Sequence, residues 1–555
     1  MIKLLCIVMV FFLSQNSYAQ FNTSWTAQYQ HTVQSGFSNE GRKIVEDNAG
    51  NIFMLADVTS DLDPQGLHGA ATWYYMVLTK YSPNGAVLAS LNLDVVNEMS
   101  SGYNYHSAFG LEVDASGNIF VGYTYYDQLT GYDVALGKYD NDLVRIWTNT
   151  YSTSGTDSGV EMKLHANGTL YAIVKSTDVL TTYSIIESVP ASLPATLIYS
   201  YPPNGETLKG LALDGGIKVY VTGYRMKSAR KIAYVGAINA ATSTLAWESF
   251  YTDPSAVGDN EGNDITVGAD GGIYTVGTSF VGGNYGDQVV VLKNFPGNPH
   301  FDFVAVLKGA VDNKGLLIDA DEPGWVYIGS ASLEAATIFR IPNDGNFTVP
   351  GVLDYYPLPS SQYNAVIGVT LNSMKISFNE NIYITGGVMA SGPSGNFSSF
   401  YLYRTRVVFG NALMRDGALP IEGDFDRNYE GIDLNLDYGK TDVYFLRNYW
   451  DDAHTTETVE LLDLNAPSPL RKTDLSSSSG IQFFPNPTTD FVTVKSRSAI
   501  HSVELYGVLG NRVVFSGNES KELVLDLASL ASGIYVCKLQ TEAGESIQRL
   551  TINKN

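Results

Sequence analysis

The chain has 555 residues, and its 44% hydrophobic content is that of a folded globular protein rather than a disordered one. Its 34 basic and 57 acidic residues give a net charge of −23, which repels phosphate backbones and anionic headgroups and argues against nucleic acid as a partner. Charged residues are sparse at 16%, while 53 glycines and 36 tyrosines favour many short strands joined by tight turns.

The N-terminus has the three parts of a secretory signal peptide. Lys3 supplies the positive charge, an apolar run extends from Leu4 to Leu13, and a small-x-small site ends at Ala19. We therefore expect residues up to Ala19 to be removed by cleavage before Gln20. The apolar run, about ten residues long, is too short to span a bilayer as a helix. The sequence thus predicts an exported mature chain without a transmembrane segment.

A turn rich in Gly, Asn and Asp, followed by an apolar strand with an aromatic residue, recurs through residues 20–465. Clear copies read DNAGNIFMLAD from Asp47, DASGNIFVGYT from Asp114, HANGTLYAIVK from His165 and GADGGIYTVGT from Gly268. Successive copies lie 49 to 67 residues apart, a period that holds four short strands and their loops, as in a propeller blade. Aligned on the aromatic residue, the eight copies are Phe53, Phe120, Tyr171, Tyr220, Tyr274, Tyr327, Tyr383 and Tyr444.

Three further predicted strands accompany each copy. A short apolar strand precedes the turn, as at residues 110–113, and a strand that contains Lys-Tyr follows the aromatic strand, as at residues 134–139. A fourth strand carries Trp-x-x-x-Tyr, for example Trp147 with Tyr151. The alternation of a strand places this Trp and Tyr on one face, where they can pack against the next blade. Recurrence of one four-strand cassette favours a β-propeller over one large or two separate β-sandwiches.

The two ends of the repeat region predict how the ring closes. A Trp-x-x-x-Tyr strand, Trp25 to Tyr29, comes first and has no preceding strands, while the last unit ends near Leu464 without its fourth strand. We expect the N-terminal strand to complete the last blade, which leaves no open sheet edge. This predicts an all-β, eight-bladed propeller, or a seven-bladed one if one weak copy is not a blade.

The pattern D-x-x-G-N-[IL]-[YF]-V-x-G, with its Lys-Tyr and Trp-x-x-x-Tyr strands, resembles the β-propeller repeats of bacterial secreted proteins. The resemblance covers about residues 21–465. It implies the fold but no particular activity, because such propellers carry many different functions.

A linker rich in Pro and Ser, residues 466–480, precedes a second predicted domain at residues 481–555. This domain contains F-x-P-N-P, L-Y-x-x-x-G and L-x-S-G-x-Y-x-x-x-L in that order. The motif residues are Pro485, Asn486, Pro487, Gly510, Gly533 and Tyr535.

These motifs resemble the type A sorting domain of type IX secretion. The resemblance implies an immunoglobulin-like β-sandwich that directs the folded passenger from the periplasm through the outer membrane of a Gram-negative bacterium. It also implies two partners, the type IX secretion machinery and a sortase-like peptidase that removes the domain, after which the passenger is attached to surface lipopolysaccharide or released. A generic binding sandwich is the alternative.

Catalytic motifs are absent from the sequence: there is no G-x-S-x-G, and the seven histidines show no zinc-binding spacing. Asp424, Asp426 and Asn428 match the D-x-[DN]-x-[DN] start of a calcium loop. The glycine and glutamate expected later in that loop are replaced, which Gly431 and Asp433 could partly compensate. Calcium is therefore a candidate cofactor, with an ordinary Asx-rich turn as the alternative.

A second polar loop, with a weaker case for a metal, is predicted around Asp259, Glu261, Asn263 and Asp264. Loops between blades should crowd one face, where aromatic and acidic residues suit carbohydrate or peptide recognition. The leading hypothesis is a surface or secreted binding module for glycan or protein. The alternatives are a carbohydrate- or peptide-active hydrolase or lyase whose carboxylates converge on the propeller face, and a coat protein without a discrete ligand.

Overall fold

The computed structural model of the chain describes residues 19–20, 22–29, 39–60, 73–97, 107–127, 129–188, 194–203, 205–216, 218–254, 256–282, 286–307, 312–320, 324–344, 351–355, 365–377, 381–392, 395–407, 413–419, 427–436, 442–451, 457–465, 482–484, 488–506, 512–530, 533–541 and 544–554. These residues form strands and turns, and none of the described ranges contains a helix that could cross a membrane. They divide into two compact units between Pro467 and Ser468.

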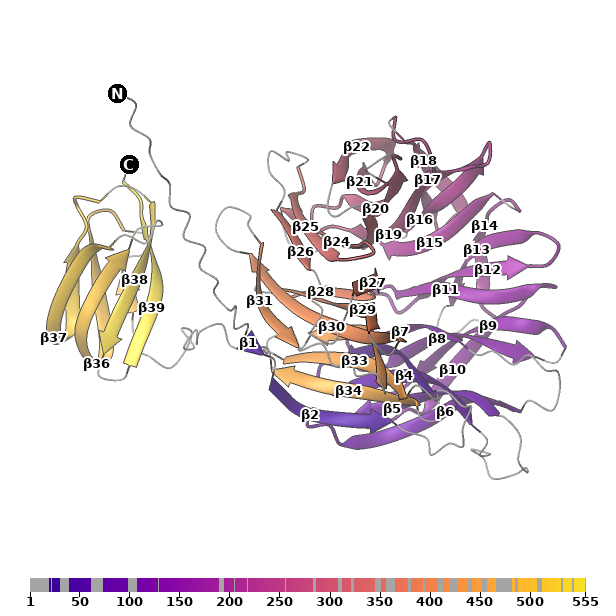
Figure 1. Cartoon of the computed structure of the whole chain (residues 1–555), viewed down its shortest axis with the longest axis horizontal. Coiled ribbons are helices and arrows are strands. Elements are labelled where there is room, and N and C mark those ends of the chain that lie inside the picture. Colours follow the sequence, from indigo (N-terminus) through magenta and orange to yellow (C-terminus); the bar gives the residue numbers. More distant parts are fainter. Residues whose placement is uncertain are drawn as a thin grey trace. The chain divides into compact units, whose positions relative to one another are not determined.

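The described strands of the first unit form eight sheets that follow one another around it in chain order (Figure 1). The first to sixth sheets each contain four consecutive strands in antiparallel pairing. The first three sheets are β3 (Asn39–Glu46), β4 (Ile52–Ser60), β5 (Trp73–Tyr81) and β6 (Val87–Asn97); β7 (Ser107–Val113), β8 (Ile119–Asp127), β9 (Gly131–Tyr139) and β10 (Arg145–Tyr151); and β11 (Thr156–Leu164), β12 (Leu170–Thr177), β13 (Thr181–Ser188) and β14 (Thr196–Ser200). The next three are β15 (Glu206–Leu213), β16 (Lys218–Lys227), β17 (Arg230–Asn239) and β18 (Thr244–Tyr251); β19 (Asn260–Val267), β20 (Ile273–Phe280), β21 (Asp287–Phe295) and β22 (Asn298–Leu307); and β23 (Lys314–Asp319), β24 (Trp325–Ala331), β25 (Ala336–Pro342) and β26 (Gly351–Tyr355).

The last two sheets include strands from the N-terminus. In the seventh sheet the first strand is divided into β27 (Ala365–Val369) and β28 (Ser373–Ile376), which both pair with β29 (Asn381–Gly392); β30 (Gly395–Val407), β31 (Leu413–Leu419) and the parallel strand β1 (Ala19–Gln20) follow. The eighth sheet contains β32 (Arg427–Leu436), β33 (Asp442–Asp451), β34 (Glu457–Asn465) and β2 (Asn22–Tyr29). Strand β2 pairs antiparallel with β34, so the N-terminal Trp-x-x-x-Tyr strand lies beside the last strand of the repeat region.

The first strands of the sheets contact one another in a cycle. Each contacts the first strand of the next sheet, and β32 of the eighth sheet contacts β3 of the first. Hydrogen bonds between described residues join the first sheet to the eighth: Gly41 N donates to Asn448 Oδ1 (2.8 Å), and Ile44 N donates to Asp433 Oδ2 (3.2 Å). The arrangement is that of propeller-like radial sheets.

We call the first strand of each sheet its inner strand. Every inner strand has a register shift next to a glycine. The glycines are Gly41, Gly110, Gly159, Gly210, Gly262, Gly315, Gly368 and Gly431. A bulge bends the strand and re-aims its side chains. The bare backbone also lets the neighbouring sheet approach, because a Cβ on Gly262 would lie 2.0 Å from Thr222 Oγ1.

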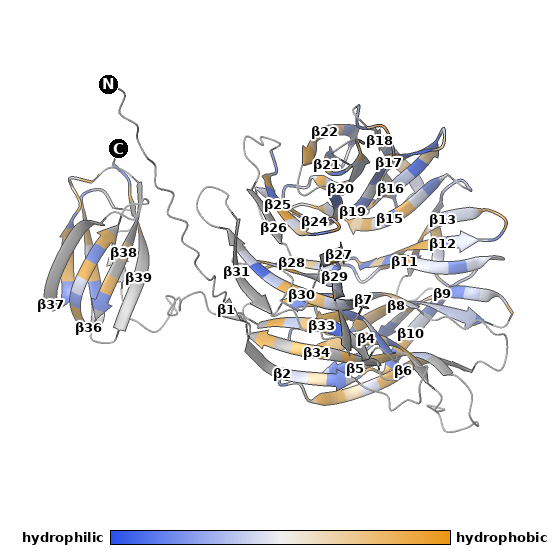
Figure 2. Cartoon of the chain, viewed as in Figure 1, coloured by the Kyte–Doolittle hydropathy of each residue, from blue (hydrophilic) through white to orange (hydrophobic). Residues whose placement is uncertain are grey.

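The core of the first unit lies between successive sheets, and hydrophobic residues run along the strands that face it (Figure 2). All eight aligned aromatic residues occur in the second strand of a sheet, or in β29 of the seventh sheet, and none is more than 6% exposed. In the fifth sheet, Tyr274 donates to Asp270 Oδ2 of the turn (2.8 Å), and Lys293 Nζ bonds the same oxygen (2.9 Å) and lies 5.0 Å from the Tyr274 ring centroid. In this sheet the Asp of the turn, the aromatic residue and the Lys of the third strand therefore contact one another.

The Trp-x-x-x-Tyr strand packs against the next sheet, as its alternation predicts. Trp247 packs against Tyr220 of its own sheet and donates from Nε1 to the carbonyl of Pro296 in the following sheet (3.0 Å). Four residues later, Tyr251 makes an edge contact with Phe301 of that following sheet. This pair therefore joins adjacent sheets.

The second unit contains β35 (Gln482–Phe484), β36 (Phe491–Tyr506), β37 (Arg512–Asp526), β38 (Gly533–Thr541) and β39 (Gly544–Ile552). The long strand β36 pairs with β37 on one edge, and with β35 and then β38 on the other. Two hairpins join described strands, since Tyr506 pairs with Arg512 and Thr541 with Gly544. Cys537 lies in the core, and burial raises its pKa to about 12.

Candidate functional site

A pocket of about 360 Å³ lies where the fourth, fifth and sixth sheets of the first unit meet. Its lining comes from the starts of the inner strands β19 and β23, the end of the second strand β20 and the starts of the third strands β17 and β21, so it opens at one edge of all three sheets. The lining residues are Lys231, Gly258, Asp259, Glu261, Thr278, Phe280, Asp287 and Lys314.

One wall is the segment that leads into β19, and it is fixed to the end of β20. Val257 N and Gly258 N donate to the carbonyl of Phe280 (3.1 and 3.2 Å), and Phe280 N donates to the carbonyl of Asp259 (2.9 Å). A Cβ on Gly258 would lie 2.5 Å from Phe280 Cδ1, so the phenyl ring rests directly on the glycine. Phe280 is still 40% exposed and lines the pocket.

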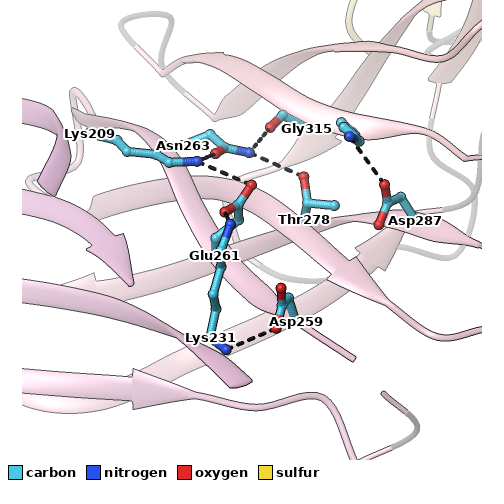
Figure 3. Close-up of polar contacts among 9 residues, drawn as sticks. Lys209, Lys231, Asp259, Glu261, Asn263, Thr278, Asp287 and Gly315 are labelled. Atoms are coloured by element: carbon cyan, nitrogen blue, oxygen red, sulfur yellow. Dashed lines mark hydrogen bonds and ion pairs between the residues drawn. The ribbon is translucent and has the colours of Figure 1, made fainter. Parts of the chain in front are cut away.

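Glu261 bridges two lysines from the fourth sheet (Figure 3). Its Oε2 accepts from Lys231 Nζ at 2.8 Å, and its Oε1 lies 3.1 Å from Lys209 Nζ. Burial alone would raise the pKa of Glu261, but the hydrogen bond from Lys231 and the nearby Lys209 lower it overall. The same hydrogen bond raises the pKa of Lys231. Both groups are therefore charged near neutral pH.

Asn263 connects this ion pair to the next sheet. Its Oδ1 accepts from Lys209 Nζ (2.7 Å), and its Nδ2 donates to Thr278 Oγ1 (3.1 Å) and to the carbonyl of Gly315 (2.7 Å) (Figure 3). The pocket is thus backed by hydrogen bonds across three sheets, which orient its charged groups before any ligand arrives.

Asp287 differs from Glu261 in the direction of its pKa shift. Burial raises its pKa, and the neighbouring carboxylates Asp312 and Glu261 act in the same direction against the opposing charge of Lys314. Lys314 Nζ is 3.6 Å from Asp287 Oδ2 and its side chain is largely exposed, so it holds Asp287 only loosely.

The second polar loop predicted from the sequence is corrected here. Glu261, Asn263 and Asp264 lie in strand β19, because tertiary pairing overrides the low strand propensity of polar residues; Asp259 alone precedes it. Glu261 is held by lysines, and none of the described residues form a group of three His, Cys, Asp or Glu that could hold a metal. The partners Lys209, Lys231, Asp287 and Lys314 were not anticipated, since no local pattern indicates which strand starts meet.

A second charged group lies on the inner strands. Burial raises the pKa of Glu112, which interacts electrostatically with Lys163 of the third sheet and Lys375 of the seventh. Burial also raises the pKa of Asp264, helped by the charge of Glu161. Two of these carboxylates bond the next inner strand: Glu161 Oε2 accepts from Leu211 N (2.6 Å), and Asp264 Oδ2 from Ile318 N (2.9 Å). These residues tie neighbouring sheets together.

Only part of the candidate calcium segment lies within the described residues. Asp424 and Asp426 lie outside the described residues, while Asn428 is in strand β32, where it pairs with Trp450. Asp433 is buried, and its carboxylate accepts from Ser373 Oγ, Leu434 N and Ile44 N. These bonds occupy the carboxylate that was expected to compensate for the missing ligand.

The described residues include part of the sorting motif and the predicted cleavage site. Pro485, Asn486, Pro487 and Gly510 lie outside the described ranges. Gly533 begins β38 opposite Ile552, and Tyr535 packs against the core of the second unit. Ala19 and Gln20 form β1 and pair with Gly417 and Ala418.

Residues 482–553 match the family model of the secretion system C-terminal sorting domain. This is the sorting domain of type IX secretion, so the chain is directed to the cell surface or beyond it, and the secretion machinery is a partner. The match covers the second unit, and the pocket lies in the first.

Solved structures similar to this chain have low sequence identity to it. A polysaccharide lyase of family PL25, an ulvan lyase, is 10% identical with a TM-score of 0.40, covering 78% of this chain and 95% of its own. The periplasmic gluconolactonase PpgL of Pseudomonas aeruginosa is 13% identical (TM-score 0.38; 66% and 98% covered). The β-propeller domain of the Trilobed protease from Pyrococcus furiosus is 8% identical (TM-score 0.36; 68% and 98%). No curated protein matches the sequence.

Proposed function

We propose that this chain is an exported binding protein, a closed eight-bladed β-propeller that recognises glycan or protein at the pocket around Glu261. The observation that carries the proposal is the pocket itself. It combines an exposed aromatic ring with oriented ammonium and carboxylate groups, the mixture by which concave sites fix and orient a ligand.

The architecture behind this proposal takes each sheet of the first unit as one blade. It is supported by the cycle of contacts between inner strands and by the pairing of β2 with β34. In this reading β2 is the outer strand of the eighth blade, and its pairing closes the ring.

For the route of export, we propose removal of residues 1–19 between Ala19 and Gln20. Residues 20–465 are then the propeller, 466–480 the linker and 481–555 an immunoglobulin-like sorting domain. Pairing of β36 with strands on both edges is compatible with such a sandwich. A sortase-like peptidase would remove this domain and leave the propeller attached to the surface or released.

Binding is favoured over catalysis because the best-placed carboxylate is already engaged. Glu261 holds two lysines, and its lowered pKa keeps it ionised, so it cannot act as a general acid near neutral pH. An ion-paired, fixed group is better suited to hold a ligand than to exchange protons with it.

The test is to screen the purified chain against glycan and protein arrays, and then to measure affinity for the ligand found. Lys231→Met and Glu261→Gln should weaken binding about tenfold or more, since the first removes an ammonium group from the pocket and the second leaves both lysines without their shared carboxylate. Lys227→Met, an exposed lysine near the end of β16 outside the pocket, is the matched control. Undiminished binding by folded pocket variants would locate the site elsewhere.

One observation favours a hydrolase or lyase as the second candidate. Glu261 and Asp287 line the same pocket, and their pKa values are shifted in opposite directions, the separation expected for a base and an acid. In that case Asp287→Asn would abolish cleavage of a bound polysaccharide or peptide while leaving its affinity nearly unchanged. If the wild-type chain cleaves no substrate in degradation screens, the hydrolase or lyase function is ruled out.

A further inference from the structure

We infer that the pocket around Glu261 takes an uncharged, hydroxyl-rich ligand, a neutral sugar unit of a glycan, rather than a sulfated or uronic acid sugar. This inference rests on the proposed binding function and names the ligand class of that site.

The first argument is the balance of charge. The pocket and its backing residues bring together three ammonium groups and three carboxylates, those of Lys209, Lys231, Lys314, Asp259, Glu261 and Asp287. The two lysines closest to Glu261 share its carboxylate, so both already have an anionic partner. An anionic sugar would have to displace these carboxylates or lie beside them. The net charge of −23 adds a further penalty for an anionic ligand at long range.

The second argument is the arrangement of donors and acceptors. Ammonium groups only donate hydrogen bonds and carboxylates only accept them, whereas a hydroxyl does both. The ammonium groups of Lys231 and Lys314 and the carboxylates of Glu261 and Asp287 can therefore each bond a different hydroxyl, with charge-assisted strength. A ligand with several adjacent hydroxyls can use all of these donors and acceptors.

The third argument is the phenyl ring of Phe280. It is 40% exposed at the pocket and rests on Gly258, so its position is set before binding. The carbon-bound hydrogens of a sugar ring present an apolar face that can pack on such a ring. The pocket volume, about 360 Å³, is at the lower end of the range for ligand sites and suits a small unit at the end or side of a chain.

The test is binding of the full chain to an array of neutral, sulfated, uronic acid and peptide ligands, followed by affinity measurements at low and high salt. We expect neutral glycans to bind with an affinity that salt hardly changes, since no net charge is neutralised. Phe280→Ala should weaken binding about tenfold, and Asp259→Asn should weaken it several-fold.

Two matched controls should bind normally. Phe295→Ala removes a ring whose exposure is similar to that of Phe280, at the end of β21 opposite the pocket residue Asp287. Asp178→Asn changes an exposed carboxylate between β12 and β13. Binding of sulfated or uronic acid glycans alone, with strong salt dependence, would overturn the neutral class while keeping the site. Binding of peptide ligands alone would likewise overturn the neutral-sugar class while keeping the site. Neutral-glycan binding that the pocket variants leave intact would overturn both this inference and the proposed site.

Discussion

Asp264 is a carboxylate of the inner strands whose ionisation opposes folding. Burial raises its pKa above the ordinary value of 3.8, and the charge of Glu161 acts in the same direction. The folded state therefore binds the proton more tightly than the unfolded state does. The contribution of this group to stability is greatest below pH 3.8 and is lost progressively as the pH rises towards its raised pKa.

Asp264→Asn changes the free energy of unfolding, and we expect this change to be about 1–2 kcal/mol more favourable to the folded state at pH 8 than at pH 4. An amide oxygen can still accept from Ile318 N, so the bond between β19 and β23 is kept. Thermal or denaturant unfolding of both proteins at the two pH values measures the difference. Asp178→Asn, on an exposed carboxylate, should show no such trend. A stability difference that stays constant from pH 4 to pH 8 would contradict the assignment.

The glycine of the second strand, in the V-x-G part of the repeat, faces the bulge of the inner strand. A Cβ on Gly277 would lie 2.0 Å from the backbone oxygen of Glu261, which cannot move without disturbing the β19–β20 pairing. Gly277→Ala should therefore cost about 1–3 kcal/mol, the range for overpacking. Gly297→Ala, in a turn with nothing within 4 Å of an added Cβ, is the control. Equal unfolding midpoints for the two variants would argue against the close approach.

At the scale of elements, strand β2 completes the eighth sheet with residues from the opposite end of the repeat region. Ala27 packs beside buried residues of that sheet and of the first, including Val459 and Ile44. Removing β2 exposes the edge of β34 and uncovers this apolar contact.

We expect deletion of residues 21–31 to lower the Tm by about 5 °C or more, since losing even a few kcal/mol of the free energy of unfolding produces such a shift. A synthetic peptide of residues 21–31 should restore part of the loss, and a scrambled peptide should not. An unchanged Tm for the deletion would mean that the ring does not depend on this strand.

The strands could be predicted from the sequence because their pattern is local and repeated. The turn and the aromatic residue lie within a few residues of each other, the Lys-Tyr strand follows in the same repeat unit, and the structure has all eight aromatic positions buried. The divided first strand of the seventh sheet, β27 and β28, has no such local signal and was not anticipated.

The pocket could not be predicted in the same way. Lys231, Glu261 and Lys314 are far apart in sequence, and they meet only because the third strand β17 and the inner strands β19 and β23 of the neighbouring sheets start at the same edge. Placing them requires the register of three sheets and the position of each bulge, which depend on packing rather than on composition. The sequence identified Glu261 and Asn263 as polar residues of interest but assigned them to a loop.

At the scale of the whole molecule, the two units have separate tasks. The first contains the pocket and the second matches a sorting domain, and the contacts that build each core lie within its own unit. The sorting domain should therefore be removable without loss of the fold of the first unit. It should also be transferable to another protein.

Deletion of residues 481–555 should leave the first unit folded but retained in the periplasm. The expected result is full loss of surface exposure, measured by adding protease to intact cells, with periplasmic protein that keeps the wild-type unfolding midpoint of its propeller. In the reciprocal experiment, fusion of residues 466–555 behind a signal peptide and a soluble carrier should bring the carrier to the surface. The carrier without these residues is the control. Surface exposure of the deletion variant, or retention of the fusion, would show that the second unit does not direct export, because its match to the sorting family predicts both outcomes.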